Sequence, residues 1–360
     1  MNPYIGHETQ ISGVEEHRLV GGKGDGMRLY EATNGKGLEL TLSPDRNGDI
    51  TRLRYKGINM SYFSPCGYVA PAYYDKTGSN WLQSFTAGFL TTCGLQAVGT
   101  PCTDDGEELP LHGSIANQPC AHSYWDENEK EIRIHSVTKD EVIFGRKLVL
   151  KRTVSVTKDE VIFGRKLVLK RTVSVTKDEV IFGRKLVLKR TVTISKEENT
   201  FSIDDHIENT GSKTEPMEIL YHMNMGYPLL DEDSEVTIPS VEVRARDDHA
   251  QEDIANWMHM EKPQGDYQER CYYHKFEGAD GKAGIYQPKL NVGLEISFDA
   301  SKLDGFVEWK MMGVRDYVLG LECGNCYPDG RDVMRKTGML KFLKPGEAVD
   351  YHVDIKLYQK

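Results

Sequence analysis

Three short segments of this chain each place an ionisable side chain in an otherwise apolar strand or beside a glycine turn. These side chains are His112, His222 and Glu322, in segments 109–117, 219–228 and 317–324. A carboxyl group at a strand end beside glycine loses water, which raises its pKa and suits it to abstract a proton near neutral pH. Two histidines can supply the acid and a second hydrogen-bond donor. Each residue alone is more often structural, but the set predicts a proton-transfer site.

The elements that must position these residues are predicted to be β-strands. Apolar and polar residues alternate with a period of two, and helical periodicity is nearly absent apart from a short helix expected at 253–260. We therefore predict an all-β fold, an antiparallel β-supersandwich that forms a single domain over residues 1–360. Strands are expected at 38–42, 50–55, 131–135, 200–208, 217–223, 235–243, 290–298, 306–310, 317–322 and 348–357.

Residues 136–192 are three identical copies of the 19-residue sequence SVTKDEVIFGRKLVLKRTV. Old repeats diverge, so identical copies indicate a recent duplication or deliberate engineering that added two units, 38 residues, to a shorter chain. Each unit is interpreted as one long strand, bulged at Gly145 or its equivalent, and a turn at Thr-Lys-Asp-Glu.

Two added units return the chain to its original direction. We therefore expect the sheet to be extended by two inserted strands, as a hairpin that widens the sheet or protrudes from it. The alternative is that the surplus copies loop out. Identical strands also favour pairing between molecules, so a homo-oligomer through the extended sheet edge is expected.

The charge pattern argues against a nucleic-acid partner. The chain has a net charge of −10, with +9 in the three repeats and −19 in the other 303 residues. Lys and Arg of the repeats alternate with apolar residues, which is typical of a solvated sheet face. There is no apolar run of 18 residues to predict a membrane span, and residues 1–10 lack the pattern of a signal peptide. We therefore expect a cytoplasmic protein whose seven cysteines are thiols.

The order of several short motifs resembles the aldose 1-epimerase (galactose mutarotase-like) superfamily, particularly a little-characterised bacterial branch. The resemblance covers roughly residues 25–358 apart from the extra repeats. Its motifs are the glycine-rich run 88–99, Leu-Pro-Leu-His-Gly at 109–113, Asn-Thr-Gly at 209–211, Leu-Glu-Cys-Gly-Asn at 321–325 and Leu-Lys-Pro-Gly-Glu at 343–347.

The resemblance implies a role for each of the three ionisable residues. Glu322 would be the general base, His222 the general acid and His112 an orienting donor. The reaction would interconvert the anomers of an aldose or sugar derivative by opening and reclosing its ring. Such an isomerase needs no cofactor and no metal, and its partner is a small carbohydrate.

Sugar contacts are harder to assign from the sequence. Members of the superfamily often carry an arginine in the segment before the first histidine, but residues 88–99 contain none. Asn117 and Asn224 are candidates for contacts with sugar hydroxyls, and Trp81 and Trp309 for a stacking face. Structural amides and core aromatic residues are the commoner roles for these types.

Other classes of function use the same residues. A carbohydrate-binding protein could keep the cleft without catalysis. His112, His222 and Glu322 could form a two-histidine, one-carboxylate metal site. A lyase or hydrolase could use the same sandwich. The lone Cys323-Gly-Asn-Cys326 motif lacks the second ligand pair of a zinc site, so it predicts no metal.

Overall fold

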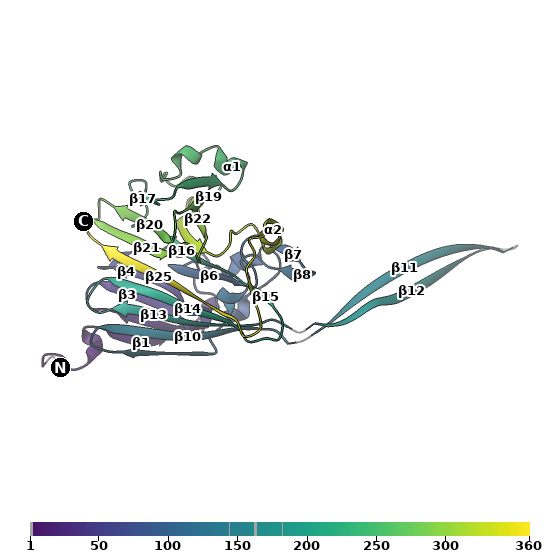
Figure 1. Cartoon of the computed structure of the whole chain (residues 1–360), viewed down its shortest axis with the longest axis horizontal. Coiled ribbons are helices and arrows are strands. Elements are labelled where there is room, and N and C mark those ends of the chain that lie inside the picture. The colour runs from purple at the N-terminus through teal and green to yellow at the C-terminus, as the bar shows by residue number, and fades with distance from the viewer. Residues whose placement is uncertain (1–2, 144, 162–163, 182) are drawn as a thin grey trace.

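The computed structural model describes residues 3–143, 145–161, 164–181 and 183–360, with side chains described in 3–143 and 183–360. Three antiparallel sheets dominate the fold (Figure 1). A five-stranded sheet has the order β1-β2-β3-β4-β5, with bounds Gly13–Arg18, Arg28–Thr33, Leu38–Ser43, Asp49–Tyr55 and Ile58–Asn59.

The two larger sheets pack face to face. The eight-stranded sheet has the order β17 (Glu235–Thr237), β20 (Asp280–Gln287), β21 (Val292–Asp299), β25 (Ala348–Tyr358), β14 (Thr200–Asn209), β13 (Lys185–Ser195), β10 (Glu131–Glu141), β9 (His122–Glu127). The six-stranded sheet has the order β18 (Glu242–Ala245), β19 (Arg270–Lys275), β22 (Gly305–Met312), β23 (Tyr317–Gly324), β16 (Glu218–Met225), β6 (Leu90–Leu95).

Short elements complete the fold. Two small pairs are β7 (Cys102–Asp104) with β8 (Glu107–Leu109), and β15 (Glu215–Pro216) with β24 (Phe342–Leu343). The α-helices are α1 (Asp248–Gln251) and α2 (Arg331–Thr337). The 3₁₀ turns are η1 (Glu8–Gln10), η2 (Gly22–Gly24), η3 (Pro44–Arg46), η4 (Pro71–Tyr73), η5 (Asn80–Ser84), η6 (Ile115–Asn117) and η7 (Ile254–Asn256).

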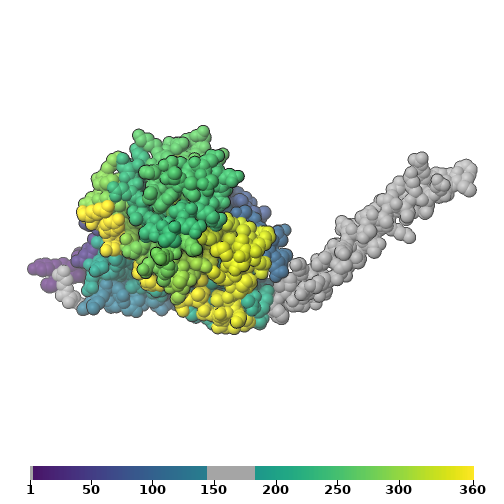
Figure 2. Space-filling view, turned by 45° about the horizontal axis from the view of Figure 1, so that its top comes forward, coloured from purple at the N-terminus to yellow at the C-terminus, as the bar shows by residue number. Residues whose placement is uncertain are grey.

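One hydrophobic core joins all three sheets. Its buried residues include Leu40 of the five-stranded sheet, Ile203 and Val353 of the eight-stranded sheet, and Tyr221 and Leu321 of the six-stranded sheet. In Figure 2 the green and yellow C-terminal half covers much of the visible face of the body. The predicted all-β antiparallel sandwich is confirmed. None of the helices in the described part of the chain has the length and apolar character that a membrane crossing requires.

Some predicted elements differ from the structure. The expected helix at 253–260 is only the 3₁₀ turn η7, and α2 was not expected at all. The expected strand at 235–243 is two strands in different sheets, since β17 pairs with β20 and β18 with β19, and Pro239, which has no N–H to donate, lies between them. Most residues of α2 are charged and only Arg331 and Met334 are buried, so the sequence shows no clear apolar face for this helix.

The repeats do not lengthen the eight-stranded sheet, which corrects that expectation. β10 pairs directly with β13, with Glu141 opposite Lys185. The backbone between them forms β11 (Gly145–Val161) and β12 (Gly164–Ile181), an antiparallel pair that is a sheet of its own and extends away from the body (Figure 1). The hairpin therefore protrudes rather than widens the sheet.

The phase of each repeat also differs from the prediction. The Thr-Lys-Asp-Glu stretch of the first copy lies inside β10, where it was expected to form a turn. β10 ends at Glu141, β11 at Val161 and β12 at Ile181, so each break between strands lies in or next to the Val-Ile-Phe-Gly part of a unit. Gly145 begins a strand and is not a bulge within one. The three units together therefore form the two arms of one hairpin, β10 with β11 and β12 with β13, and within the repeats the chain turns back only between β11 and β12, in the second copy.

Buried ion pairs explain the arginines that interrupt the apolar face of the repeat. In the third copy, Arg184 donates two hydrogen bonds of 2.9 Å to Asp140 of the first copy. Arg190, only 1% exposed, donates two of 2.7 Å to Asp205 and one of 2.8 Å to Asp49. Burial of a charge is tolerated when hydrogen-bonded counter-charges surround it. These side chains fix the register of β10, β13 and β14.

Replacing Asp205 with alanine should strongly destabilise the fold. The change leaves Arg190 buried with one carboxylate fewer, and breaking a buried pair costs about 3–5 kcal/mol. Urea unfolding should show this loss. The matched control is Glu208→Ala on the same strand, which breaks the exposed 3.2 Å pair with Lys189 and should cost about 0–1 kcal/mol. Equal losses for the two variants would contradict a dominant role of the buried network.

Deleting two repeat units should leave a folded protein. The shortened chain retains Asp140 and one copy of each arginine, and it joins β10 to β13 through a single Val-Ile-Phe-Gly-Arg reversal. Cooperative urea unfolding of the shortened chain, with a midpoint at least equal to that of the full chain, is the expected result. A chain of 322 residues that fails to fold would show that the added units are needed.

Candidate active site

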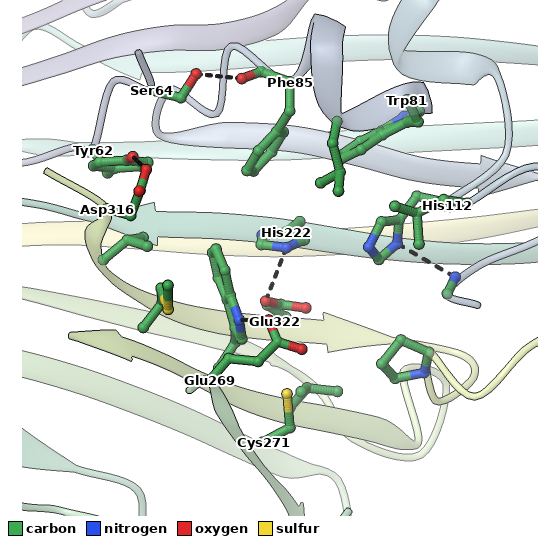
Figure 3. A pocket seen from close by; sticks show the side chains of 18 of the residues that line it. Tyr62, Ser64, Trp81, Phe85, His112, His222, Glu269, Cys271, Asp316 and Glu322 are labelled. Atoms are coloured by element: carbon green, nitrogen blue, oxygen red, sulfur yellow. Dashed lines mark hydrogen bonds and ion pairs between the residues drawn. The ribbon is translucent and has the colours of Figure 1, made fainter. Parts of the chain in front are cut away.

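His222 and Glu322 face each other on two neighbouring strands of the six-stranded sheet. β16 and β23 pair antiparallel with His222 opposite Glu322. Alternate residues such as Tyr221 and Leu321 enter the core, so the pleat turns His222 and Glu322 to the other face. Both side chains are buried, and His222 Nε2 lies 3.3 Å from Glu322 Oε1 (Figure 3).

Gly320 provides the space that the Glu322 carboxyl group occupies. Residues 320 and 322 lie on the same face of β23. A β-carbon at position 320 would collide with Glu322 Oε1 and would lie 3.1 Å from the β-carbon of Trp309. Glycine at this position therefore allows the carboxyl group and the indole to lie side by side.

His112 lies on a tight turn beside the pair. Its φ is +55° and that of Gly113 is +71°, in the left-handed region that few residues other than glycine adopt. The Gly99 N–H donates to His112 Nδ1 at 3.3 Å. Because Nδ1 accepts, Nε2 carries the proton of the neutral ring. The His112 and His222 ring centroids are 5.7 Å apart, so His112 offers an N–H donor next to the pair.

Burial controls the protonation of all three groups. It raises the pKa of Glu322 well above the usual range, and the nearby Glu269 carboxylate adds to the rise. Burial lowers the pKa of His222 well below its usual value, and His112 lowers it further. Burial also lowers the pKa of His112 to about 4. Burial therefore favours the uncharged forms of Glu322 and His222, and His112 is uncharged near neutral pH.

The pair has unused hydrogen-bonding capacity. His222 Nδ1 and Glu322 Oε1 are buried and make no hydrogen bond within the described part of the chain. The 3.3 Å contact between the two side chains is too poorly aligned to count as one. Buried polar atoms without partners are costly and uncommon, so these atoms are suited to contact a ligand.

A cleft of about 630 Å³ opens over the pair. Figure 3 shows Trp81 and Phe85 on one side of the pair and Glu269 and Cys271 on the other. The Trp81 and Phe85 rings stack with centroids 4.7 Å apart. The Trp309 ring lies 5.2 Å from that of His222. The volume is that of a typical small-molecule site.

The structure brings His112, His222 and Glu322 together in this cleft, as the sequence analysis expected. Trp81 and Trp309 also line it. Asn117 and Asn224 do not.

Asn117 lies in η6, and both of its amide atoms are buried without a hydrogen bond to any residue in 3–143 or 183–360. Asn224 is fully buried on β16, and its side-chain N–H donates to the His222 carbonyl oxygen at 3.0 Å. Asn224 therefore supports the strand that carries His222. Strand alternation predicts correctly that the two residues share a face of β16, but only His222 lines the cleft.

Sequence reasoning missed several cleft residues, among them Phe85, Arg246 and Glu269. Arg246 opens the charged run Arg-Asp-Asp, which is typical of a solvated strand end. Glu269 precedes the strand β19 and is followed by Arg270, which gives the same impression. No sequence pattern marks either residue as part of a site, because the fold alone brings β18 and β19 to the cleft.

The described residues give little support to metal or disulfide chemistry. Within 3–143 and 183–360, no group of three or more His, Cys, Asp or Glu side chains is arranged to hold a metal ion. All seven cysteines are free thiols, and burial raises the pKa of Cys323 and Cys326 above the usual range. Thiols of this kind are poor nucleophiles and poor metal ligands.

Comparison with solved structures defines the class of fold as that of mutarotase-like proteins. A proposed aldose 1-epimerase from Klebsiella pneumoniae superposes with a TM-score of 0.78 at 24% identity, over 96% of this chain and 83% of that one. A galactose mutarotase-like protein from Clostridium acetobutylicum gives 0.60 at 13% identity, over 98% and 100%. Galactose 1-epimerase from Lactobacillus acidophilus gives 0.58 at 11% identity, over 97% and 99%.

The family follows from the sequence itself. The profile described as "Domain of unknown function (DUF4432)" matches residues 24–164 and 164–357, so the chain belongs to this family. The two matched parts meet at residue 164, inside the repeat region. No curated protein sequence matches the chain.

His112 should remain neutral throughout the physiological pH range. Burial lowers its pKa from 6.5 to about 4, so the ring gains a second proton only as the pH falls toward 4. The ring ¹⁵N chemical shifts of His112 should therefore show a neutral ring with the proton on Nε2 from pH 8 down to about 5. The exposed His17 is the internal control. Protonation of His112 near pH 6.5 would contradict this account of its environment.

Proposed function

We propose that this protein interconverts the anomers of an aldose or a sugar derivative by proton transfer at His222 and Glu322. The observation that carries the proposal is the buried pair itself, 3.3 Å apart, at the bottom of a cleft lined by aromatic rings. The similarity of the fold to galactose 1-epimerase and other mutarotase-like proteins supports the same reaction class.

The reaction requires one proton to leave and one to arrive. Glu322 takes the proton of the C1 hydroxyl while His222 gives a proton to the ring oxygen. The C1–O5 bond breaks, a carbonyl forms at C1, and the electron pair of the broken bond stays on O5. After rotation about C1–C2, the reverse transfers close the ring on the other face. The pair thus holds one proton before and after turnover, as its burial dictates.

Substrate binding must place that proton on His222. In the empty cleft, burial favours the neutral form of both groups, with the proton on Glu322. Hydrogen bonds from sugar hydroxyls to Glu322 stabilise its carboxylate and lower its pKa. The proton then moves across 3.3 Å to His222, which becomes the acid. Each positioned proton-transfer group contributes roughly 10²- to 10⁴-fold to the rate.

The surrounding residues hold the sugar. The rings of Trp81 and Trp309 offer apolar faces to the C–H groups of a pyranose. His112 donates its Nε2 proton to a sugar oxygen beside the reacting carbon, and the lowered pKa keeps this donor uncharged. Ring opening involves no oxidation or reduction, so these side chains supply all the chemistry that the reaction needs.

Replacing Glu322 with glutamine should abolish anomer exchange and preserve the fold. Glutamine has the same shape but cannot accept the C1 proton, so kcat should fall at least about 10²-fold. Two-dimensional exchange NMR on a panel of aldoses measures the rate for the α and β forms. Urea unfolding checks the fold.

Two other outcomes would decide against the proposal. If the parent protein speeds exchange for no sugar of a broad panel but binds one, it is a carbohydrate-binding protein. If Glu322→Gln exchanges anomers at the parental rate, Glu322 is not the base.

A further inference from the structure

A polar cluster, formed by Arg246 and Glu269, lies beside the proposed catalytic pair. Arg246, just after β18, donates from Nη1 to Glu269 Oε1 at 3.0 Å and to Cys271 Sγ at 3.0 Å. Its Nε donates to Asp247 Oδ2 at 2.9 Å. The Trp309 indole N–H donates to Glu269 Oε2 at 2.8 Å. Arg246 and Glu269 are thereby fixed as the polar end of the cleft, and both line it.

The polar cluster has a hydrogen-bond donor on Arg246 and an acceptor on Glu269 that are both available to a ligand. Arg246 Nη2 makes no hydrogen bond within the described part of the chain, although Nε and Nη1 do. Each Glu269 oxygen accepts one hydrogen bond and so retains a lone pair. A donor and an acceptor on adjoining groups match two neighbouring hydroxyls, one of which accepts while the other donates.

The opposite side of the cleft is apolar. Trp81, Leu82 and Phe85 form this wall, with Leu82 half exposed at the opening. Figure 3 shows Trp81 and Phe85 across the catalytic pair from Glu269. A hydroxyl directed at this wall would lose its hydrogen bonds to water without replacement, which is unfavourable. A carbon without a hydroxyl would gain by burial there.

The charges around the polar cluster disfavour the binding of an anionic ligand. Arg246 is the one Lys or Arg that lines the described cleft. It is already paired with two carboxylates, Asp247 and Glu269, so these three side chains together carry a net charge of −1. Asp316, also in the lining, adds another negative charge. A phosphate, sulfonate or carboxylate group on the ligand would meet repulsion from these groups.

We infer that the ligand is an uncharged sugar with two adjacent hydroxyls bound by Arg246 and Glu269 and an apolar edge, such as the methyl group of a 6-deoxyhexose, against Trp81 and Phe85. The inference rests on the proposed function for its reaction, but it concerns binding and can be judged by binding alone. Arg246 and Glu269 are, on this account, residues that determine specificity.

The test compares neutral and anionic sugars on the full-length protein. Fucose and rhamnose are the 6-deoxy probes, galactose and glucose the hydroxylated ones, and glucose 6-phosphate and glucuronate the anionic ones. Exchange NMR gives kcat and KM, and saturation-transfer NMR gives binding independently of turnover. The parent should prefer a 6-deoxyhexose, with kcat/KM at least about tenfold above that for either anion.

Glu269→Gln is the informative variant. The side-chain amide keeps the shape, and its one oxygen still accepts from the Trp309 indole, but an NH2 group replaces the charged acceptor that faces Arg246. Loss of a hydrogen bond to a charged group should raise KM for neutral sugars, and weaken their binding in saturation-transfer NMR, by about tenfold or more. The loss of a negative charge should also narrow the preference against anions. Glu252→Gln, an equal change of charge at an exposed position of the segment after α1, should alter neither quantity.

The outcomes separate this inference from the proposed function. A parent protein that prefers an anionic sugar, or a Glu269→Gln variant with an unchanged KM, overturns the inference. If no sugar is turned over, the proposed function fails, and the saturation-transfer experiment then decides. Binding of 6-deoxyhexoses that Glu269→Gln weakens would support the inference in that case, and equal binding of neutral and anionic sugars would refute it.

Discussion

The pairing of β16 with β23 is the constraint on which the site depends. All eight residues of each strand are buried, because one face lies in the core and the other lies under the loops that form the cleft. The register places His222 opposite Glu322, so the ladder of backbone hydrogen bonds sets the distance between the two side chains. A slip of one residue by either strand would turn the side chain that it carries, His222 or Glu322, into the core. The same strand pairing therefore stabilises the sandwich and sets the geometry of the proposed reaction.

A network of charges joins the repeat region to the loops around the cleft. Arg184 donates to Glu107 at 3.1 Å, and Arg331 donates to the other oxygen of Glu107 at 3.0 Å. Arg331 also donates to the Gln96 carbonyl oxygen at 3.0 Å, in the loop that ends at the contact with His112. Arg184 belongs to the third repeat copy and its partner Asp140 to the first, so both outer copies supply contacts to the body. The residues between them form β11 and β12, which extend away from the body.

The sequence was sufficient to predict the antiparallel sandwich and the strands that carry His222 and Glu322, for identifiable reasons. Alternation along 217–223 and 317–322 predicts the correct strands, and an ionisable residue on an apolar strand marks His222 and Glu322. The phase of the repeat could not be predicted, because Asp140 and Arg184 are polar residues at buried positions and their pairing is visible only in three dimensions. Arg246 and Glu269 were missed for a similar reason, since they resemble solvated strand ends until the fold places them in the cleft.

The central claim concerns where the anomeric centre of a sugar lies, and a crystal structure of the protein soaked with a sugar that it turns over tests this most directly. The account predicts that the C1 hydroxyl lies about 2.6–3.2 Å from the Glu322 carboxyl group and the ring oxygen at a similar distance from His222. A sugar bound in the cleft with C1 directed to solvent, or bound only at another surface, would contradict it.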